Sequence, residues 1–230
     1  MEDMPLPHPT PTSPTPQGLQ PAVEFDGLGV VREDSVLLLE ASGAVAPGEV
    51  LAVTGPNGSG KTTLLNVVAG RLAPTAGTVH VAGRRPDDRD PAFRTALAAL
   101  IGPVQTARDL TVLEHLRFVG ATWGRPTREA LEAGRALLAE LGIEALSGRF
   151  PHELSSGQSQ LVSLALTLAR PASVLLLDEP EQRLDPDRLG LVIDALHARA
   201  EAGTALLLAS HSPRLLEELA TSRLALEAAW

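Results

Sequence analysis

A glycine-rich segment between an apolar run and a helical pattern constrains this chain more than any other feature. The run Val50–Thr54 is followed by GPNGSGKT at residues 55–62 and then by TLLNVVAG. Glycines let consecutive backbone N–H groups curl around phosphate oxygens, and the start of a helix adds its dipole to the same anion. The pattern G-x-x-x-x-G-K-T in this strand–loop–helix context predicts a phosphate-binding loop, the alternative being a glycine-rich turn that happens to end in Lys-Thr.

The residues of this loop have separate expected roles. Lys61 can reach the β- and γ-phosphates of a nucleotide and is a candidate catalytic residue, while the Thr62 hydroxyl can bind Mg²⁺. A loop of this kind indicates a nucleoside triphosphatase without saying which one. The candidate nucleotide-binding residues in and beside the loop are Gly55, Pro56, Asn57, Gly58, Ser59, Gly60, Lys61, Thr62 and Thr63.

The composition predicts one globular domain behind a proline-rich tail. A chain of 230 residues, 44% of them hydrophobic and 20% charged, is long enough for one domain with its own core. Residues 1–21 alternate proline with Thr, Ser and His, and proline fixes φ and lacks an N–H. We expect a disordered or polyproline-like tail there, with a docking site for a proline-binding partner as the alternative, and a single domain at residues 22–230.

Short β-type runs alternate with helical patterns along the domain. This is an α/β layout, and the near-continuous apolar runs VLAVT and VLLLD suit inner strands of a sheet covered on both faces. The predicted strands are Ser35–Leu39, Val50–Thr54, Gly77–Val81, Val174–Asp178 and Ala205–Ser210. The predicted helices are Lys61–Arg71, Thr111–Thr122, Thr127–Leu141, Ser155–Arg170, Leu189–Ala202 and Pro213–Leu219.

Several classes of protein are disfavoured by what the sequence lacks. Without cysteine there is no disulfide and no thiolate metal site, which is compatible with a reducing cytosol. No stretch approaches the roughly 18 to 20 apolar residues that span a bilayer, and the acidic N-terminus has no apolar core of a secretory signal. A net charge of −9 argues against a broad surface for DNA or anionic lipid, so no nucleic-acid partner is expected.

Two carboxylates end the apolar run Val174–Asp178. Neighbouring residues at the end of a strand point in different directions, so Asp178 can hold Mg²⁺ through water while Glu179 faces an attacking water. A metal-linked aspartate and a general base are what ATP hydrolysis requires. The alternative is a strand that ends in two solvated acids.

Two further segments carry candidate residues. Ser155 and Gln158 have the spacing of a capping box, as do Thr111 and Glu114, and small residues at a helix start leave N–H groups open to an anion. His211 follows the apolar run ALLLAS, so it should lie near the other strand ends. The remaining histidines are interpreted as surface or internally satisfied residues: His8, His80, His115, His152 and His197.

Taken in order, these motifs resemble the nucleotide-binding domain of ABC transporters, from about Val23 to Ala220. GPNGSGKTTLL is similar to the family's Walker A motif, VLLLDEP to its Walker B motif, and LSSGQ at residues 154–158 to its signature. LDP with Asp185 resembles the D-loop, and Ser210-His211 the switch-histidine motif. The resemblance implies a P-loop NTPase core with a mainly parallel sheet, an N-terminal antiparallel β subdomain and an inserted helical subdomain at about residues 106–153.

The same resemblance implies how the chain would work. Two nucleotide-binding domains, identical or different, would form a head-to-tail dimer around two ATP molecules with Mg²⁺, with Glu179 as general base and His211 on the γ-phosphate. Closure and opening of the dimer would drive a separate transmembrane permease from the cytoplasmic face of the membrane, since the chain has no room for a fused membrane domain. The candidate ATP contacts outside the loop are Ser155, Gly157, Gln158 and Asp185.

This sequence departs from the family pattern at four places. Arg32 or Val31 stands where an aromatic ring usually meets adenine, and a guanidinium plane can stack on the base. Gln105, the candidate Q-loop residue for ATP and Mg²⁺, is followed by a short segment to Leu110. Ser156 replaces the usual signature glycine, and residues 181–185, EQRLD, are bulky and polar where small residues are common.

Two alternative functions remain at this point. A soluble ABC ATPase that acts on nucleic acid or ribosomes usually carries coiled-coil inserts, zinc motifs or tandem cassettes, whereas this chain has one cassette and no cysteine. A regulatory subunit that hydrolyses little is disfavoured by Glu179 and His211.

Overall fold

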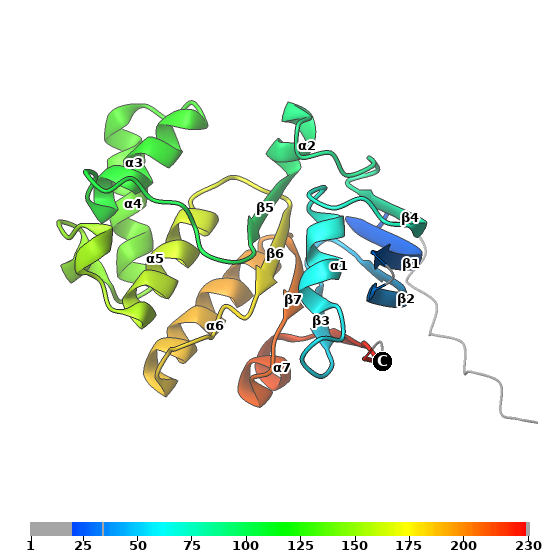
Figure 1. Ribbon diagram of the computed structural model, residues 1–230. Coiled ribbons are helices and arrows are strands. Elements are labelled where there is room, and N and C mark those ends of the chain that lie inside the picture. The colour runs from blue at the N-terminus through cyan, green and yellow to red at the C-terminus, as the bar shows by residue number, and fades with distance from the viewer. Residues whose placement is uncertain (1–19, 34, 229–230) are drawn as a thin grey trace, which may run out of the picture.

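A computed structural model describes residues 20–33 and 35–228 of the chain. Figure 1 shows a central parallel sheet with a second, antiparallel sheet on one side and a group of helices on the other. The tail predicted at residues 1–21 lies outside the described residues apart from Gln20 and Pro21.

The central sheet has the strand order β5-β6-β7-β3-β8, and every neighbouring pair within it is parallel. Its inner strands are almost entirely buried, which explains why their sequences are uninterrupted apolar runs. The bounds of the strands are Val50–Thr54 for β3, Leu97–Leu100 for β5, Val174–Asp178 for β6, Ala205–Ala209 for β7 and Ser222–Ala225 for β8.

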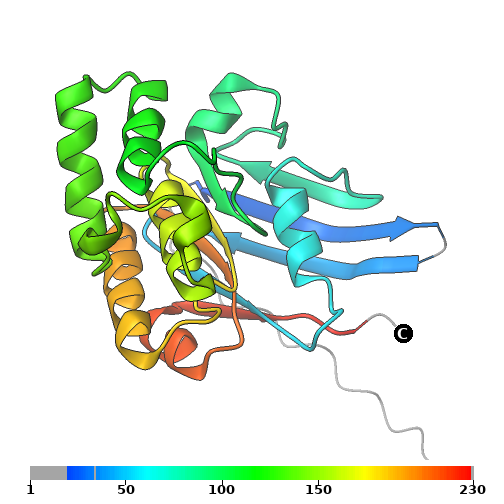
Figure 2. The ribbon, with the colours of Figure 1, turned by 60° about the vertical axis from the view of Figure 1, so that its left-hand side comes forward.

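The second sheet consists of β1 (Val23–Arg32), β2 (Ser35–Val45) and β4 (Ala76–Val81) in the antiparallel order β2-β1-β4. Buried and exposed residues mostly alternate along β1, as expected for strands that pack one face on the core. Figure 2 shows the long β1–β2 ribbon beside the helix that follows the phosphate loop.

Seven α-helices complete the described part of the chain. The six predicted helices are all present, and α2 is additional. The bounds are α1 Lys61–Val68, α2 Pro91–Ala96, α3 Val112–Thr122, α4 Thr127–Glu140, α5 Ser156–Leu168, α6 Pro186–Glu201 and α7 Pro213–Leu219, with short 3₁₀ turns at Glu144–Leu146 and Pro151–Glu153.

The differences from the sequence prediction have local causes. Strand β5 reads LAAL and follows α2 directly, so neither β-branched residues nor a turn mark its start. Strand β1 contains an irregular register around Gly27, which has a φ of 58°, and this breaks the period-two pattern. Helix α6 begins at Pro186, earlier than predicted, because Asp185 caps it and proline suits the first helical position.

The two faces of the central sheet bury two hydrophobic clusters. Along β6, Leu175 and Leu177 join the cluster beneath α3 to α7, whereas Val174 and Leu176 join the cluster beneath α1 and the antiparallel sheet. Alternate residues of one strand therefore hold both halves of the molecule, and the end of β6 is fixed between them. No helix in the described residues has both the length and the apolar character that a bilayer span needs.

Candidate functional site

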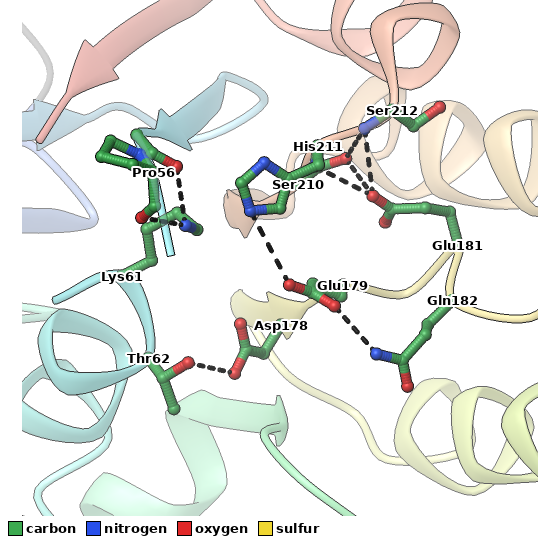
Figure 3. Close-up of polar contacts among 11 residues, drawn as sticks. Pro56, Lys61, Thr62, Asp178, Glu179, Glu181, Gln182, Ser210, His211 and Ser212 are labelled. Carbon is green, nitrogen blue, oxygen red and sulfur yellow. Dashed lines mark hydrogen bonds and ion pairs between the residues drawn. The ribbon is translucent and has the colours of Figure 1, made fainter. Parts of the chain in front are cut away.

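The carboxyl ends of three neighbouring strands meet at one edge of the central sheet. β7 lies between β3 and β6, so the loop after β3, the acids at the end of β6 and the histidine after β7 come together (Figure 3). This edge is where open parallel sheets bind ligands. The predicted meeting of Lys61, Asp178, Glu179 and His211 at one site is therefore present in the fold.

The phosphate loop depends on backbone conformations that favour glycine. Gly58 and Gly60 have φ values of 83° and 93°, and a Cβ on Gly60 would lie 2.6 Å from the carbonyl oxygen of Leu37. Helix α1 starts after Gly60 without a side-chain cap, so its first N–H groups remain available to an anion.

Lys61 is the most enclosed charge at this edge. Its side chain is buried, at 7% exposure, and its Nζ donates hydrogen bonds to the carbonyl oxygens of Gly55 at 2.8 Å and Pro56 at 3.0 Å (Figure 3). Ser59 Oγ is also buried and has no hydrogen-bond partner among the described residues. An ammonium group whose hydrogen bonds among the described residues all go to carbonyl oxygens, beside open N–H groups, suits an anionic ligand such as a nucleotide phosphate.

Thr62 and Asp178 form the candidate metal position. Thr62 Oγ1 donates a hydrogen bond of 2.8 Å to Asp178 Oδ2. Burial raises the pKa of Asp178, while the bond from Thr62 opposes that shift. The described residues contain no cluster of three or more His, Cys, Asp or Glu that could hold a metal alone. A hydroxyl and a carboxylate beside a phosphate loop fit Mg²⁺, which usually binds through few protein ligands plus substrate phosphates.

Glu179 has a strained backbone and an oriented carboxylate. Its φ of 47° lies in the left-handed region that a glutamate rarely adopts, and its N–H donates to the carbonyl oxygen of Ala209 at 2.8 Å. Gln182 Nε2 donates to Glu179 Oε2 at 2.9 Å, and His211 Nε2 lies 3.9 Å from Glu179 Oε1 (Figure 3). Gln160 Nε2 donates to the carbonyl oxygen of Glu179 at 3.1 Å.

The acids open onto a cavity of about 290 Å³ beside the sheet edge, which gives a small reactant access to them. Its lining includes Asp178, Glu179, Gln160 and Gln182, with Gly102 and Pro103 from the segment after β5. Gln105 lies slightly farther along that segment and is exposed, so its contact with a metal or nucleotide stays a prediction.

The signature residues start helix α5. The predicted capping box is confirmed: Ser155 Oγ accepts from Gln158 N at 3.3 Å, and Gln158 Oε1 accepts from Ser155 N at 2.9 Å. Gly157 is buried, and a Cβ there would lie 2.6 Å from the carbonyl oxygen of Arg183. Packing within the chain alone therefore requires a glycine at position 157. The contact of the signature residues with ATP stays a prediction.

Two other residues that are predicted to contact ATP, Asp185 and Arg32, have defined places in the fold. Asp185 caps α6 by accepting a hydrogen bond from Arg188 N at 2.9 Å. Arg32 is exposed at the end of β1, on a hairpin whose neighbouring strand β2 passes against Gly60 of the phosphate loop. An adenine contact by Arg32 and an ATP contact by Asp185 both remain predictions.

Sequence reasoning missed the residues that hold Glu179 and the turn of His211 in place. Gln160 and Gln182 bond to Glu179, and Glu181 bonds to the turn that contains His211. Gln182 and Glu181 were visible as bulky polar residues in the D-loop segment, but their partners were not. Gln160 carried no signal, because its partner is 19 residues away and depends on how α5 packs.

Comparisons with known proteins agree with this geometry. The family model described as "ABC transporter" matches residues 38–182. A putative ABC transporter ATP-binding protein of Brucella suis biovar 1 is 36% identical over 208 residues, which cover 87% of this chain and 84% of that protein. The thiamine import ATP-binding protein ThiQ of Salmonella typhimurium is 40% identical over 178 residues, which cover 74% of this chain and 72% of ThiQ.

Solved structures of the same fold support the predicted architecture. An ATP-binding subunit of an ABC transporter superposes with a TM-score of 0.80 at 25% identity, covering 89% of this chain and 85% of that one. A dimeric bacterial ABC transporter cassette gives a TM-score of 0.79 at 21% identity, covering 89% and 94% of the two chains. The predicted fold, a P-loop core with a parallel sheet and an antiparallel β sheet, is confirmed.

Replacement of Lys61 by methionine tests the anion site. Lys61→Met keeps the length of the side chain but removes its charge, and a hydrogen bond to a charged group contributes about 1.5–3 kcal/mol. We therefore expect the Kd for ATP to rise by about tenfold to hundredfold in a fluorescence titration. Arg71→Met, an exposed cation just beyond the same helix, is the control and should bind as the wild type does. An unchanged Kd for Lys61→Met would contradict the site.

Replacement of Gly157 by alanine tests its packing role. The added Cβ meets a backbone carbonyl at 2.6 Å, and overpacking of this kind costs about 1–3 kcal/mol. Thermal unfolding of Gly157→Ala should therefore show a lower Tm than that of the control Gly148→Ala, where a Cβ meets nothing within 4 Å. Equal Tm values for the two variants would show that α5 and the segment at Arg183 move apart to admit the Cβ without loss of stability. That result would contradict the packing role of Gly157.

Proposed function

The chain belongs to the ABC transporter family as an ATP-binding and ATP-hydrolysing cassette, and on that premise we propose that Glu179 is the general base of the hydrolysis. The observation that carries this proposal is the strained backbone of Glu179 just after β6, with its carboxylate oriented by a hydrogen bond from Gln182 and with His211 Nε2 3.9 Å from it. Strained backbone is concentrated at functional sites, and a carboxylate held next to a candidate metal ligand is the arrangement that water activation needs.

The other residues at this end of the sheet bind the phosphates and the metal ion in this proposal. Lys61 and the open N–H groups of α1 hold the β- and γ-phosphates, and Lys61 exchanges its bonds to Gly55 and Pro56 for bonds to the nucleotide. Thr62 and Asp178 would hold Mg²⁺, and Gln105, on the segment after β5, would add a third ligand to it. When bound, Mg²⁺ neutralises charge on the β- and γ-phosphate oxygens.

The proton transfer follows from the placement of Glu179. Its carboxylate takes a proton from water as the water oxygen attacks the γ-phosphorus, and the bond from that phosphorus to the bridging oxygen breaks. His211 approaches the γ-phosphate from the end of β7, between the loop and the acids. Adenine lies against the β1–β2 hairpin, on Arg32 and its apolar neighbours, because this hairpin borders the phosphate loop at Gly60.

A second cassette completes the site in this proposal. Ser155 and Ser156 are exposed at the start of α5, and the N–H groups of a helix start favour an anion. A head-to-tail dimer, of identical or different subunits, brings Ser155, Gly157 and Gln158 of one cassette to the nucleotide of the other. Asp185 lies at the junction between them. One solved structure of like fold is itself described as dimeric.

The dimer drives a separate transmembrane permease from the cytoplasmic face of the membrane. Relatives of this chain are described as import ATP-binding proteins, for thiamine in one case and for an anion in another. The helical part, at about residues 106–153, includes Phe118, which is 61% exposed on α3 and suits contact with an apolar partner. No observation favours the nucleic-acid alternative, and the net charge of −9 weighs against it.

The Glu179→Gln variant tests the general base. The amide keeps the size of the side chain and cannot take a proton, so phosphate release should fall by about 10²- to 10⁴-fold while ATP still binds. Light scattering in the presence of ATP and Mg²⁺ should show accumulated dimer. Glu217→Gln, at an exposed position of α7, makes the same change away from the site and should hydrolyse ATP normally. Hydrolysis by Glu179→Gln at the wild-type rate would exclude Glu179 as the base.

Purification from membranes tests the partner. The full-length chain, isolated in a mild detergent from the cells that produce it naturally, should carry with it a chain with several membrane spans. Phe118→Ser should weaken this association, whereas Leu191→Ser, an exposed apolar residue on α6, should not. Recovery of nucleic acid with no membrane-embedded chain would overturn the transporter assignment.

A further inference from the structure

A carboxylate outside the proposed catalytic set holds the turn that carries His211. Glu181 Oε1 accepts hydrogen bonds from Ser210 Oγ, from His211 N at 3.1 Å and from Ser212 N at 3.2 Å (Figure 3). One carboxylate oxygen therefore binds three successive residues after β7. Hydrogen bonds to an ionised acceptor are among the strongest in proteins, so this set of contacts fixes the turn.

The surroundings of Glu181 make the arrangement specific. Its other oxygen, Oε2, is buried and has no hydrogen-bond partner in the described part of the chain. Ser210 is 1% exposed, and its Oγ also accepts from Ser212 N at 3.0 Å. Leaving a buried carboxylate oxygen unpaired is costly, so the three contacts of Oε1 must offset that cost for the side chain to stay there.

The contacts of Glu181 extend the pairing of β6 with β7 beyond the strands. Asp178 pairs with Ala209 in the sheet, and the N–H of Glu179 then donates to the carbonyl oxygen of Ala209. Glu181 adds the next connection, from the segment after β6 to the turn after β7. The Glu179 carboxylate and the His211 imidazole, 3.9 Å apart, belong to the two segments that Glu181 joins.

We propose that Glu181 is a positioning residue that sets the His211 imidazole relative to Glu179 and the γ-phosphate. Glu181 acts through the Ser210–Ser212 turn and does not itself touch the nucleotide. The proposal rests on the roles given above to Glu179 and His211, and it adds that this chain fixes its histidine with a carboxylate from the segment that follows the general base.

Two substitutions distinguish the effect of the hydrogen-bond acceptor of Glu181 from the effect of its side-chain size. Glu181→Met keeps a similar length without a carboxylate, whereas Glu181→Gln keeps one strong acceptor oxygen. Because a misplacement of about 1 Å at a reacting group can cost about a hundredfold in rate, we expect Glu181→Met to lower kcat by about tenfold to hundredfold. The KM for ATP should change by less than about threefold, and Glu181→Gln should recover most of kcat.

The position of the histidine is measured separately from activity. The ring signals of His211 in NMR spectra of the nucleotide-free protein, assigned with His211→Ala, should move in Glu181→Met. The signals of His115, which is buried on α3, should stay in place. Glu217→Met, which removes a carboxylate from an exposed position of α7, should alter neither the His211 signals nor kcat.

A double-mutant cycle with His211 shows whether Glu181 acts through it. If it does, Glu181→Met in the His211→Ala background should lower the residual kcat by less than about twofold, because the group being positioned is already gone. Equal losses in both backgrounds would overturn the proposal, as would unmoved His211 signals or an unchanged kcat in Glu181→Met. If Glu181→Met fails to fold, Ser210→Ala removes one of the three donors and must show a smaller shift of the same signals together with a smaller loss of kcat.

Failure of this proposal differs from failure of the proposed function. Normal turnover by Glu179→Gln would overturn the assignment of the base. Loss of turnover by Glu179→Gln together with full activity and unmoved His211 signals in Glu181→Met would overturn the positioning role alone.

Discussion

The pairing of β7 with both β3 and β6 is the constraint on which this site depends. Parallel pairing in register brings Val53, Ala209 and Asp178 to the same edge of the sheet, so the residues that follow each strand share one space. Because the strands are buried on both faces, their register is fixed by two hydrophobic clusters. The apolar runs thus position the phosphate loop against the acids and the histidine.

The polar contacts at this edge fall into two groups. Lys61 and Thr62 contact partners that a nucleotide and Mg²⁺ would replace or join: two loop carbonyls and the carboxylate of Asp178. Glu179 and His211 instead are held by residues with no ligand to bind, including Gln160, Gln182 and Glu181. The chain therefore leaves Lys61 and Thr62 free to exchange partners and keeps Glu179 and the turn that carries His211 fixed.

The fold gives a physical explanation for two of the departures from the family pattern. The polar D-loop residues Glu181 and Gln182 are bonded to the histidine turn and to the general base. Ser156 is exposed at the start of α5, where its side chain is accommodated, whereas its neighbour Gly157 is packed against a carbonyl oxygen and has no space for a Cβ. Within the chain, the substitution thus falls at the signature position that has room for a side chain.

The sequence by itself determined the phosphate loop, the acid pair, the capping boxes of α3 and α5 and the α/β class, because each rests on residues close together in the chain. It did not reveal β5, whose LAAL run lacks a strand signal, β1, whose pattern is broken near Gly27, or the short strand β8 at Ser222–Ala225. Only the tertiary structure decided that β7 lies between β3 and β6, and with it that His211 faces Glu179 and that Glu181 and Gln160 support them. Strand order and the packing of α5 arise from contacts between distant segments, and hydrophobic pattern alone does not encode which buried strand lies beside which.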